Sequence, residues 1–259
     1  MTMKLTGFQE NFALVTGAVG GIGQAMVAAL LEAGATVVAT DLPEALAAAD
    51  CRDSAELLWR PLDVASQSPD ALIAEAEARF GPLRLGVHAA GVLSTLPLLD
   101  APADEWARVM DTNARGVFNA GTAMGRAMRA HGKGGSIVVV GSNAAGVPRM
   151  NMGIYAASKA AAAMLTRCLG LELAGHGIRC NIVAPGSTLT PMQTGMWADE
   201  QGAARVIAGD GASFRTGIPL GKLATPEDIA AAAMYLLSEQ AGHVTMTDLY
   251  VDGGATLRA

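Results

Sequence analysis

The chain has 259 residues and a formal net charge of −6, with 51% hydrophobic but only 4% aromatic residues. This length suits one α/β domain with an aliphatic core, and no linker, repeat or low-complexity segment divides residues 1–259. An acidic balance without a basic stripe argues against nucleic-acid binding, and no apolar run approaches the roughly 20 residues that span a bilayer. The three cysteines have neither metal-ligand spacing nor a disulfide pattern, so we expect no metal site and a reducing, cytoplasmic setting.

The N-terminal part of the chain predicts a strand, a glycine-rich turn, a helix and a second strand. Residues 12–16 and 36–40 are short apolar runs, and apolar side chains recur at helical spacing over residues 22–33. Glycines between the first strand and the helix let the backbone approach a pyrophosphate, whose charge meets the helix N-terminus. These glycines are Gly17, Gly21 and Gly23.

Asp41 follows the second strand and predicts which dinucleotide binds. A carboxylate about twenty residues after the glycine turn is typical of hydrogen bonding to the adenosine ribose hydroxyls. Its negative charge would repel a 2′-phosphate, and no Lys or Arg lies in the turn or directly after Asp41 to neutralise one. We therefore expect NAD rather than NADP.

The rest of the chain continues the alternation of apolar runs and helical segments. The further predicted strands are residues 57–62, 85–90, 136–140, 178–183 and 248–251. Seven strands in this order predict a Rossmann-type, doubly wound and mainly parallel sheet flanked by helices. Ligands of such sheets lie beyond the carboxyl ends of the strands, and the residues placed there are Asp41, Asp63, Gly91, Ser142, Pro185 and Gly186.

Tyr155 and Lys159 stand four residues apart in a helical segment, so both side chains can point into one cleft. A tyrosine has a pKa of about 10 in water, and a neighbouring cation favours the phenolate and lowers that value. The pair, with Ser142 upstream, predicts an oxidoreductase in which a tyrosine acts as the base.

The set of glycine turn, Asn113, Ser142, Tyr155 and Lys159 resembles the short-chain dehydrogenase/reductase family, and the resemblance runs from residue 12 to residue 254. It implies that Tyr155 accepts the alcohol proton and that Ser142 holds the substrate oxygen. It implies that Lys159 lowers the pKa of the tyrosine and binds the nicotinamide ribose. Asn113 is expected to hold a water on the route from Lys159 to solvent.

The resemblance also implies the rest of the NAD site. Asp63 and Val64 are expected against adenine, and Thr188 and Thr190 beside the nicotinamide carboxamide. Further expected cofactor contacts are Ile22, Ala90, Gly91, Pro185 and Gly186. One departure is His88-Ala-Ala-Gly91, where the family usually has Asn-Asn-Ala-Gly. We interpret His88 as a buried or loop-bridging imidazole outside the catalytic set.

Stretches between residues 148 and 254 resemble family members of catecholate-siderophore synthesis. These enzymes oxidise the C3 alcohol of 2,3-dihydro-2,3-dihydroxybenzoate, a small anionic cyclohexadiene carboxylic acid, to the aromatic acid. Arg149 is the candidate for the carboxylate, because a guanidinium can hold a carboxylate bidentately. A segment of about residues 187–216 is expected to cover the substrate, and the other candidate substrate contacts are Asn143, Met152, Met192 and Gln193.

Three alternative functions stay open on the sequence alone. Asn143 departs from the aspartate expected in the siderophore enzymes and favours a 2-amino substrate, as in the trans-2,3-dihydro-3-hydroxyanthranilate dehydrogenases of antibiotic pathways. The others are a 3-oxoacyl or general ketone reductase and a non-catalytic NAD-binding interaction protein. Small residues in the helical segments 113–128 and 155–173 favour close helix packing between subunits, and the family resemblance implies a homotetramer.

Overall fold

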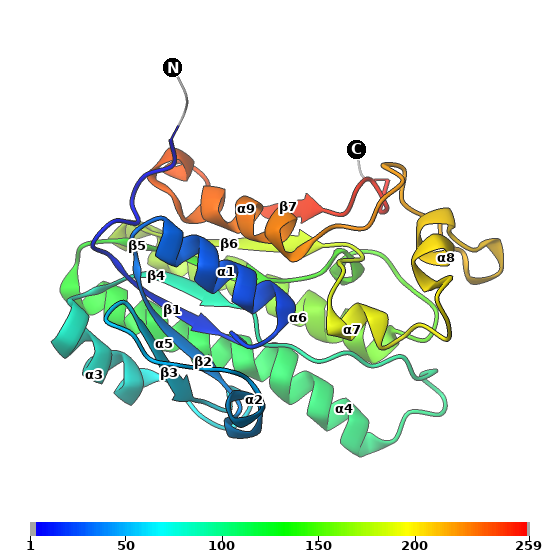
Figure 1. Cartoon of the computed structure of the whole chain (residues 1–259), viewed down its shortest axis with the longest axis horizontal. Coiled ribbons are helices and arrows are strands. Elements are labelled where there is room, and N and C mark those ends of the chain that lie inside the picture. Colours follow the sequence, from blue (N-terminus) through cyan, green and yellow to red (C-terminus); the bar gives the residue numbers. More distant parts are fainter. Residues whose placement is uncertain (1–3, 258–259) are drawn as a thin grey trace.

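A computed structural model describes residues 4–257, which form a seven-stranded parallel sheet with helices on both faces (Figure 1). Its strand order is β3-β2-β1-β4-β5-β6-β7. The strands are β1 (Phe12–Thr16), β2 (Thr36–Asp41), β3 (Leu57–Pro61), β4 (Leu83–His88), β5 (Gly135–Val140), β6 (Ile178–Pro185) and β7 (Asp248–Val251). The order reverses between β1 and β4, and such a reversal leaves a crevice at the carboxyl ends of the strands.

The central strands are mostly apolar because helices cover both faces of the sheet. Every residue of β1 is buried, and the four central residues of β2 are buried. The predicted seven-stranded sheet is confirmed, although β4 begins and ends two residues earlier than the pattern of apolar residues indicates. His88 is consequently the last residue of β4, where it pairs with Thr16 of β1.

The helices are α1 (Gly21–Glu32), α2 (Pro43–Ala48), α3 (Asp70–Phe80), α4 (Ala103–Met110), α5 (Gly116–His131), α6 (Gly153–Leu173), α7 (Pro191–Thr194), α8 (Gly202–Ala208) and α9 (Pro226–Leu237). Helices α1 and α9 pack together over one face, and α3, α5 and α6 cover the other (Figure 1). Helix α9 begins with a capping box between Thr225 and Asp228 and has Pro226 in its first turn. Two buried apolar clusters fill the layers between the sheet and the helices.

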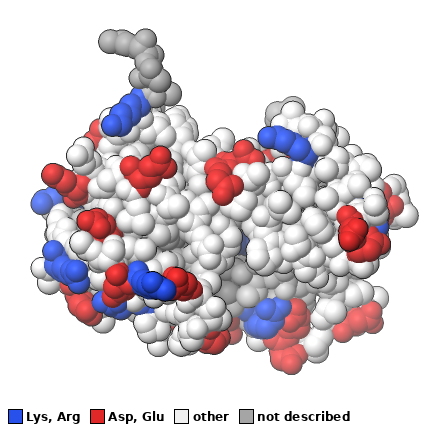
Figure 2. All heavy atoms as spheres, in the orientation of Figure 1, with Lys and Arg blue, Asp and Glu red and all other residues white. Residues whose placement is uncertain are grey.

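Residues 187–216, including α7 and α8, stand at the carboxyl end of the sheet (Figure 1). Figure 2 shows a hollow between this segment and the body of the molecule, with acidic and basic side chains interspersed around it. Within residues 4–257, no helix is both long enough and apolar enough to cross a membrane.

Candidate active site

The glycine turn between β1 and α1 is packed so tightly that side chains are excluded from two of its positions. A Cβ atom on Gly23 would lie 2.1 Å from the Gly17 carbonyl oxygen, and one on Gly17 would lie 2.3 Å from the Ala90 nitrogen. Gly17 also has a φ of +68°, which L side chains rarely adopt. The turn therefore presents bare backbone at the N-terminus of α1, as the pyrophosphate of a dinucleotide requires.

Asp41 ends β2 beside this turn. Its Oδ2 accepts a hydrogen bond from the Val19 amide at 2.9 Å, and its Oδ1 accepts one from the Leu42 amide at 2.8 Å. Each carboxylate oxygen has a second lone pair, which leaves acceptor capacity for ribose hydroxyls. The residues present at the turn and at Asp41 thus fit the adenosine half of a dinucleotide.

Asp63 and Val64 lie in the loop after β3, the strand that pairs with β2. The Asp63 carboxylate accepts hydrogen bonds from the Ala65 amide and the Ser66 hydroxyl, which fixes the loop. Val64 is buried, and its carbonyl accepts a hydrogen bond from Asn119 of α5. Both residues are placed at the same edge of the sheet as Asp41.

Asn113 lies in a turn of π-helix (Asp111–Arg115) between α4 and α5, a form that is frequent at functional sites. Its Oδ1 accepts from the Val92 amide at 2.8 Å, and its Nδ2 donates to the Val92 carbonyl and the Ser158 hydroxyl, both at 2.9 Å. Asn113 therefore fixes the loop after β4, which contains Ala90 and Gly91, against α6.

His88 is buried, and its Nδ1 lies 2.8 Å from the Thr16 hydroxyl across the β1–β4 pair. Burial, reinforced by the charge of Lys159, lowers the pKa of His88 to about 3. A neutral, enclosed imidazole bridging two strands agrees with leaving His88 outside the catalytic set.

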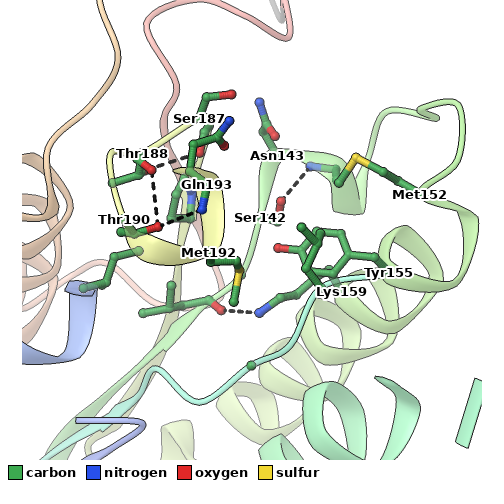
Figure 3. A pocket seen from close by; sticks show the side chains of 18 of the residues that line it. Ser142, Asn143, Met152, Tyr155, Lys159, Ser187, Thr188, Thr190, Met192 and Gln193 are labelled. Atoms are coloured by element: carbon green, nitrogen blue, oxygen red, sulfur yellow. Dashed lines mark hydrogen bonds between the residues drawn. The ribbon is translucent and has the colours of Figure 1, made fainter. Parts of the chain in front are cut away.

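Ser142 and Tyr155 face each other across the crevice (Figure 3). Ser142 follows β5 and caps a short 3₁₀ turn (Asn143–Ala145), where its Oγ accepts from the Ala144 amide at 3.1 Å. Its hydroxyl lines the same cavity as the phenol of Tyr155, which stands in the first turn of α6. A substrate oxygen between these two hydroxyls would be within reach of a proton acceptor and a hydrogen-bond donor.

Lys159 is buried one helical turn after Tyr155, and its Nζ donates to the Val140 carbonyl at 2.9 Å (Figure 3). The Nζ lies 5.9 Å from the centre of the Tyr155 ring. Burial lowers the pKa of Lys159 to about 8, because the charged amine loses hydration. Lys159 thus lines the same cavity as Tyr155, with its ammonium hydrogen-bonded to the last residue of β5.

The expected lowering of the Tyr155 pKa by Lys159 is not what the structure shows. Burial raises the pKa of the phenol above its usual value of 10.0, and the groups that oppose this rise are the hydroxyl of Ser142 and the positive charge of Arg149. The physical reason is that desolvation of the phenolate outweighs the nearby positive charges.

A cavity of about 140 Å³ joins these groups to the other predicted contacts. Its wall includes all five candidate substrate residues, with Met152 on one side and Met192 and Gln193 of α7 on the other (Figure 3). Predicted cofactor residues that also line it are Ile22, Gly91, Pro185, Gly186, Thr188 and Thr190. Predicted residues that do not line it are Gly17, Gly21, Gly23, Asp41, Asp63, Val64, Ala90 and Asn113.

Asn143 lines the cavity, but its amide has a partner outside it. The Nδ2 donates to Asp252 Oδ2 at 3.3 Å, and in Figure 3 the side chain points away from Ser142 and Tyr155. An aspartate at position 143 would instead face the Asp252 carboxylate, and like charges repel at such a distance. The hydrogen bond to Asp252 thus explains an asparagine at position 143, and no contact with a substrate substituent is needed to explain it.

Arg215 lines the same cavity and was missed from the sequence. It lies in the covering segment, just before the stretch of residues 217–222 that carries part of the resemblance, and no motif includes it. Ser187 and Leu93 also line the cavity. Ser187 could have been found, because it stands inside the Pro185–Thr190 motif.

Comparison with known proteins defines the class of enzyme. Residues 17–256 match a family model described as "Enoyl-(Acyl carrier protein) reductase". A solved structure of a short-chain type dehydrogenase/reductase from Mycobacterium ulcerans has a TM-score of 0.86 and 29% identity, covering 98% of this chain and 92% of that one. The chain belongs to the short-chain dehydrogenase/reductase family, and it is an alcohol-oxidising oxidoreductase that uses a nicotinamide cofactor.

Two similar relatives carry a more particular name. The chain is 48% identical to the 2,3-dihydro-2,3-dihydroxybenzoate dehydrogenase of Bacillus subtilis (strain 168), with 98% of this chain and 99% of the relative covered. It is 44% identical to the vibriobactin-specific 2,3-dihydro-2,3-dihydroxybenzoate dehydrogenase of Vibrio cholerae, again over 98% of this chain and 99% of the relative.

Proposed function

We propose that the chain oxidises the C3 alcohol of 2,3-dihydro-2,3-dihydroxybenzoate, using NAD, to give the aromatic 2,3-dihydroxybenzoate. The observation that carries the proposal is one cavity in which Ser142 and Tyr155 face each other beside a guanidinium, Arg149. The names of the two relatives support the same substrate. A hydroxyl pair and a fixed cation are what an anionic ring alcohol needs for orientation and deprotonation.

Each protein group has a distinct task in this reaction. The Ser142 hydroxyl holds the substrate oxygen, and the Tyr155 phenolate accepts its proton. Lys159 lies beneath the phenol, where its ammonium can bind the nicotinamide ribose, and Asn113 keeps the neighbouring loop in place. When bound, NAD supplies the acceptor for the hydride that leaves the same carbon. Loss of the proton and the hydride gives a ketone that tautomerises to the aromatic ring.

The 2-amino alternative depended on Asn143. Because the amide of Asn143 is bonded to Asp252, this residue no longer favours a 2-amino group, and we retain the 2-hydroxy substrate. The test is NADH formation measured by absorbance with the 2-hydroxy and 2-amino dihydrobenzoates, a neutral cyclohexanol and a 3-hydroxyacyl thioester. Fastest turnover of the 2-amino acid or of the thioester would overturn the proposal.

Removing the hydroxyl of Tyr155 tests whether the chain is an enzyme or an NAD-binding protein without catalytic activity. We expect Tyr155→Phe to abolish NADH formation while NAD binding, followed by calorimetry, is retained. Tyr235→Phe, on the half-exposed side of α9, is the matched control and should keep full activity. Equal activity of both variants would contradict a catalytic role for Tyr155.

The preference for NAD over NADP is tested at Asp41. The carboxylate lies beside the turn, where it would face a 2′-phosphate, so Asp41→Asn should raise kcat/KM with NADP relative to NAD. The asparagine keeps the shape and one acceptor for the Val19 amide. Equal kcat/KM with the two cofactors in the unmodified enzyme would refute the preference.

A further inference from the structure

Two arginines, Arg149 and Arg215, line the substrate cavity. Arg149 precedes α6, and Arg215 lies at the end of the covering segment. Both residues line the 140 Å³ cavity, and both also line a second cavity of about 570 Å³ beside it. The only side-chain hydrogen bond of Arg215 among residues 4–257 runs to the Met152 sulfur at 3.9 Å, a weak acceptor on the same wall.

In the described part of the chain, no carboxylate is paired with either of these two guanidinium groups. Within residues 4–257, neither Arg149 nor Arg215 forms an ion pair, and the positive charge of Arg215 acts with burial to lower the pKa of Arg149. Two carboxylates act on the pair from a distance, Asp252 on Arg149 and Asp210 on Arg215. Asp252 is engaged by the loop that follows it, and Asp210 by Ser213.

The chain holds Arg215 in place by a strained turn. Asp210 and Arg215 exchange two backbone hydrogen bonds of 2.9 Å, so residues 210–215 form a closed hairpin. Gly209 and Gly217 flank it so closely that a Cβ on Gly209 would lie 2.5 Å from the Gly217 nitrogen. Phe214, at the turn, has a φ of +57°, which costs energy for a residue with a side chain. Such strain is common at ligand clamps.

We propose that Arg149 and Arg215 together form a carboxylate site, in which one guanidinium is carried by the fixed wall and the other by the covering segment. This inference rests on the proposed oxidation of a cyclic carboxylic acid. A carboxylate has about four lone-pair directions, so it can accept from two guanidinium groups at once. Its negative charge would remove the repulsion between them, and the same contact would attach the covering segment to the substrate.

Arg205 provides a matched control. It lies on α8 in the same segment and lines the outer cavity, but its guanidinium is paired with Asp199 at 2.8 Å. Arg205→Gln therefore removes an equal charge from the same segment without touching the unpaired site.

The test is isothermal titration of salicylate, a product-like acid, and of phenol, its neutral counterpart, into the NAD-loaded enzyme. We expect Arg215→Gln and Arg149→Gln each to weaken salicylate binding at least about 10-fold, equivalent to about 1.4 kcal/mol, and to leave phenol unchanged. Arg215→Lys should fall between, because a lysine keeps the charge but not the fork. Arg205→Gln should bind both compounds as the unmodified enzyme does.

A second measurement separates a binding role from a structural one. Without any added acid, Arg215→Gln should melt at the same temperature as the unmodified enzyme or higher, because one of two repelling charges is gone. Salicylate should raise the melting temperature less in Arg215→Gln than in Arg205→Gln.

Two results would overturn the inference in distinguishable ways. If Arg215→Gln binds salicylate normally while Arg149→Gln does not, Arg149 reads the carboxylate alone and the proposed function stands. If the unmodified enzyme binds phenol as tightly as salicylate, the site does not select acids, and the proposed acidic substrate fails as well.

Discussion

Burial favours the neutral forms of both Tyr155 and Lys159, so it shifts their pKa values in opposite directions. It raises the pKa of the phenol and lowers that of the amine to about 8, so both groups are pushed toward their neutral forms. The positive charge of Arg149 opposes this for the phenol. A cationic nicotinamide ring would act in the same direction as Arg149. The ionisation of Tyr155 therefore depends on cations that face the cavity.

The first prediction concerns the pH profile of oxidation. The rate should rise with pH as Tyr155 ionises, and because Arg149 lowers the pKa of that phenol, Arg149→Gln should move the rising limb of kcat/KM to higher pH. The pH profile should be measured as log kcat/KM with a neutral cyclic alcohol, because such a substrate has no carboxylate for Arg149 to bind. Arg205→Gln should leave the limb in place, and an identical limb in Arg149→Gln would show that its charge does not act on the base.

The second prediction concerns stability. The folded pKa of Lys159, about 8, lies below the unfolded value of 10.5, so between these values the unfolded chain binds more protons than the folded one. The lysine therefore costs stability at neutral pH, and that cost disappears as pH rises through this window. Relative to Lys159→Met, the unmodified protein should gain at most about 1.4 kcal/mol per pH unit from pH 8 to 10.5. Urea unfolding at several pH values measures this difference, and parallel pH curves for the two proteins would contradict it.

In the turn between β1 and α1, close backbone contacts decide which glycines could be replaced by a residue with a side chain. Gly23 and Gly20 both stand in it, but a Cβ would meet the Gly17 oxygen at 2.1 Å from Gly23 and at an ordinary 3.4 Å from Gly20. A side chain at position 23 would therefore force the backbone of the turn to shift, whereas one at position 20 would not.

The third prediction uses this difference. Gly23→Ala should cost about 1–3 kcal/mol of stability, as overpacking does, and should weaken NAD binding because the turn must shift. Gly20→Ala is the control and should bind NAD normally. Thermal melting and NAD titration of both variants provide the measurement, and equal NAD affinity in the two would show that the turn adapts.

The sequence predicts those strands and site residues that are marked by a pattern of neighbouring residues. Residues 12–16 have the predicted strand bounds because a buried parallel strand is a continuous apolar run between turn residues, and the bounds of residues 248–251 also agree with the prediction. The positions of Ser142, Tyr155 and Lys159 at one cavity also followed from motif spacing. The partner of Asn143 is 109 residues away, and Arg215 reaches the cavity only through the folded covering segment. The pKa of Tyr155 likewise depends on burial, which spacing does not reveal.

For the whole molecule, the outer surface of α4, α5 and α6 carries large apolar side chains in contact with solvent. Phe118 is 54% exposed, Met164 56% and Leu171 68%. Behind them, glycines allow α5 and α6 to pack closely, with a Cβ on Gly125 only 2.8 Å from Leu173. Apolar exposure of this kind marks a protein–protein contact. We propose that this surface joins copies of the chain in a homotetramer.

The fourth prediction tests the assembly. Light scattering at micromolar concentration should give four times the 26.3 kDa mass of one chain. Phe118→Glu should reduce that mass, because a charge would be buried at the contact. Phe214→Glu, which is 86% exposed in the covering segment, should leave it unchanged. A mass of one chain for the unmodified protein would refute the assembly.

The hydrogen bond between Asn143 and Asp252 has a consequence for the order in which the protein is made. Asp252 directly follows β7, and β7 is translated after every other strand of the sheet. A nascent chain that already carries Ser142, Tyr155 and Lys159 still lacks the carboxylate that holds the turn beside Ser142. Synthesis therefore adds the reactive side chains before the carboxylate that fixes the turn next to Ser142. A chain that ends before β7 lacks this hydrogen bond and should be unable to turn over substrate.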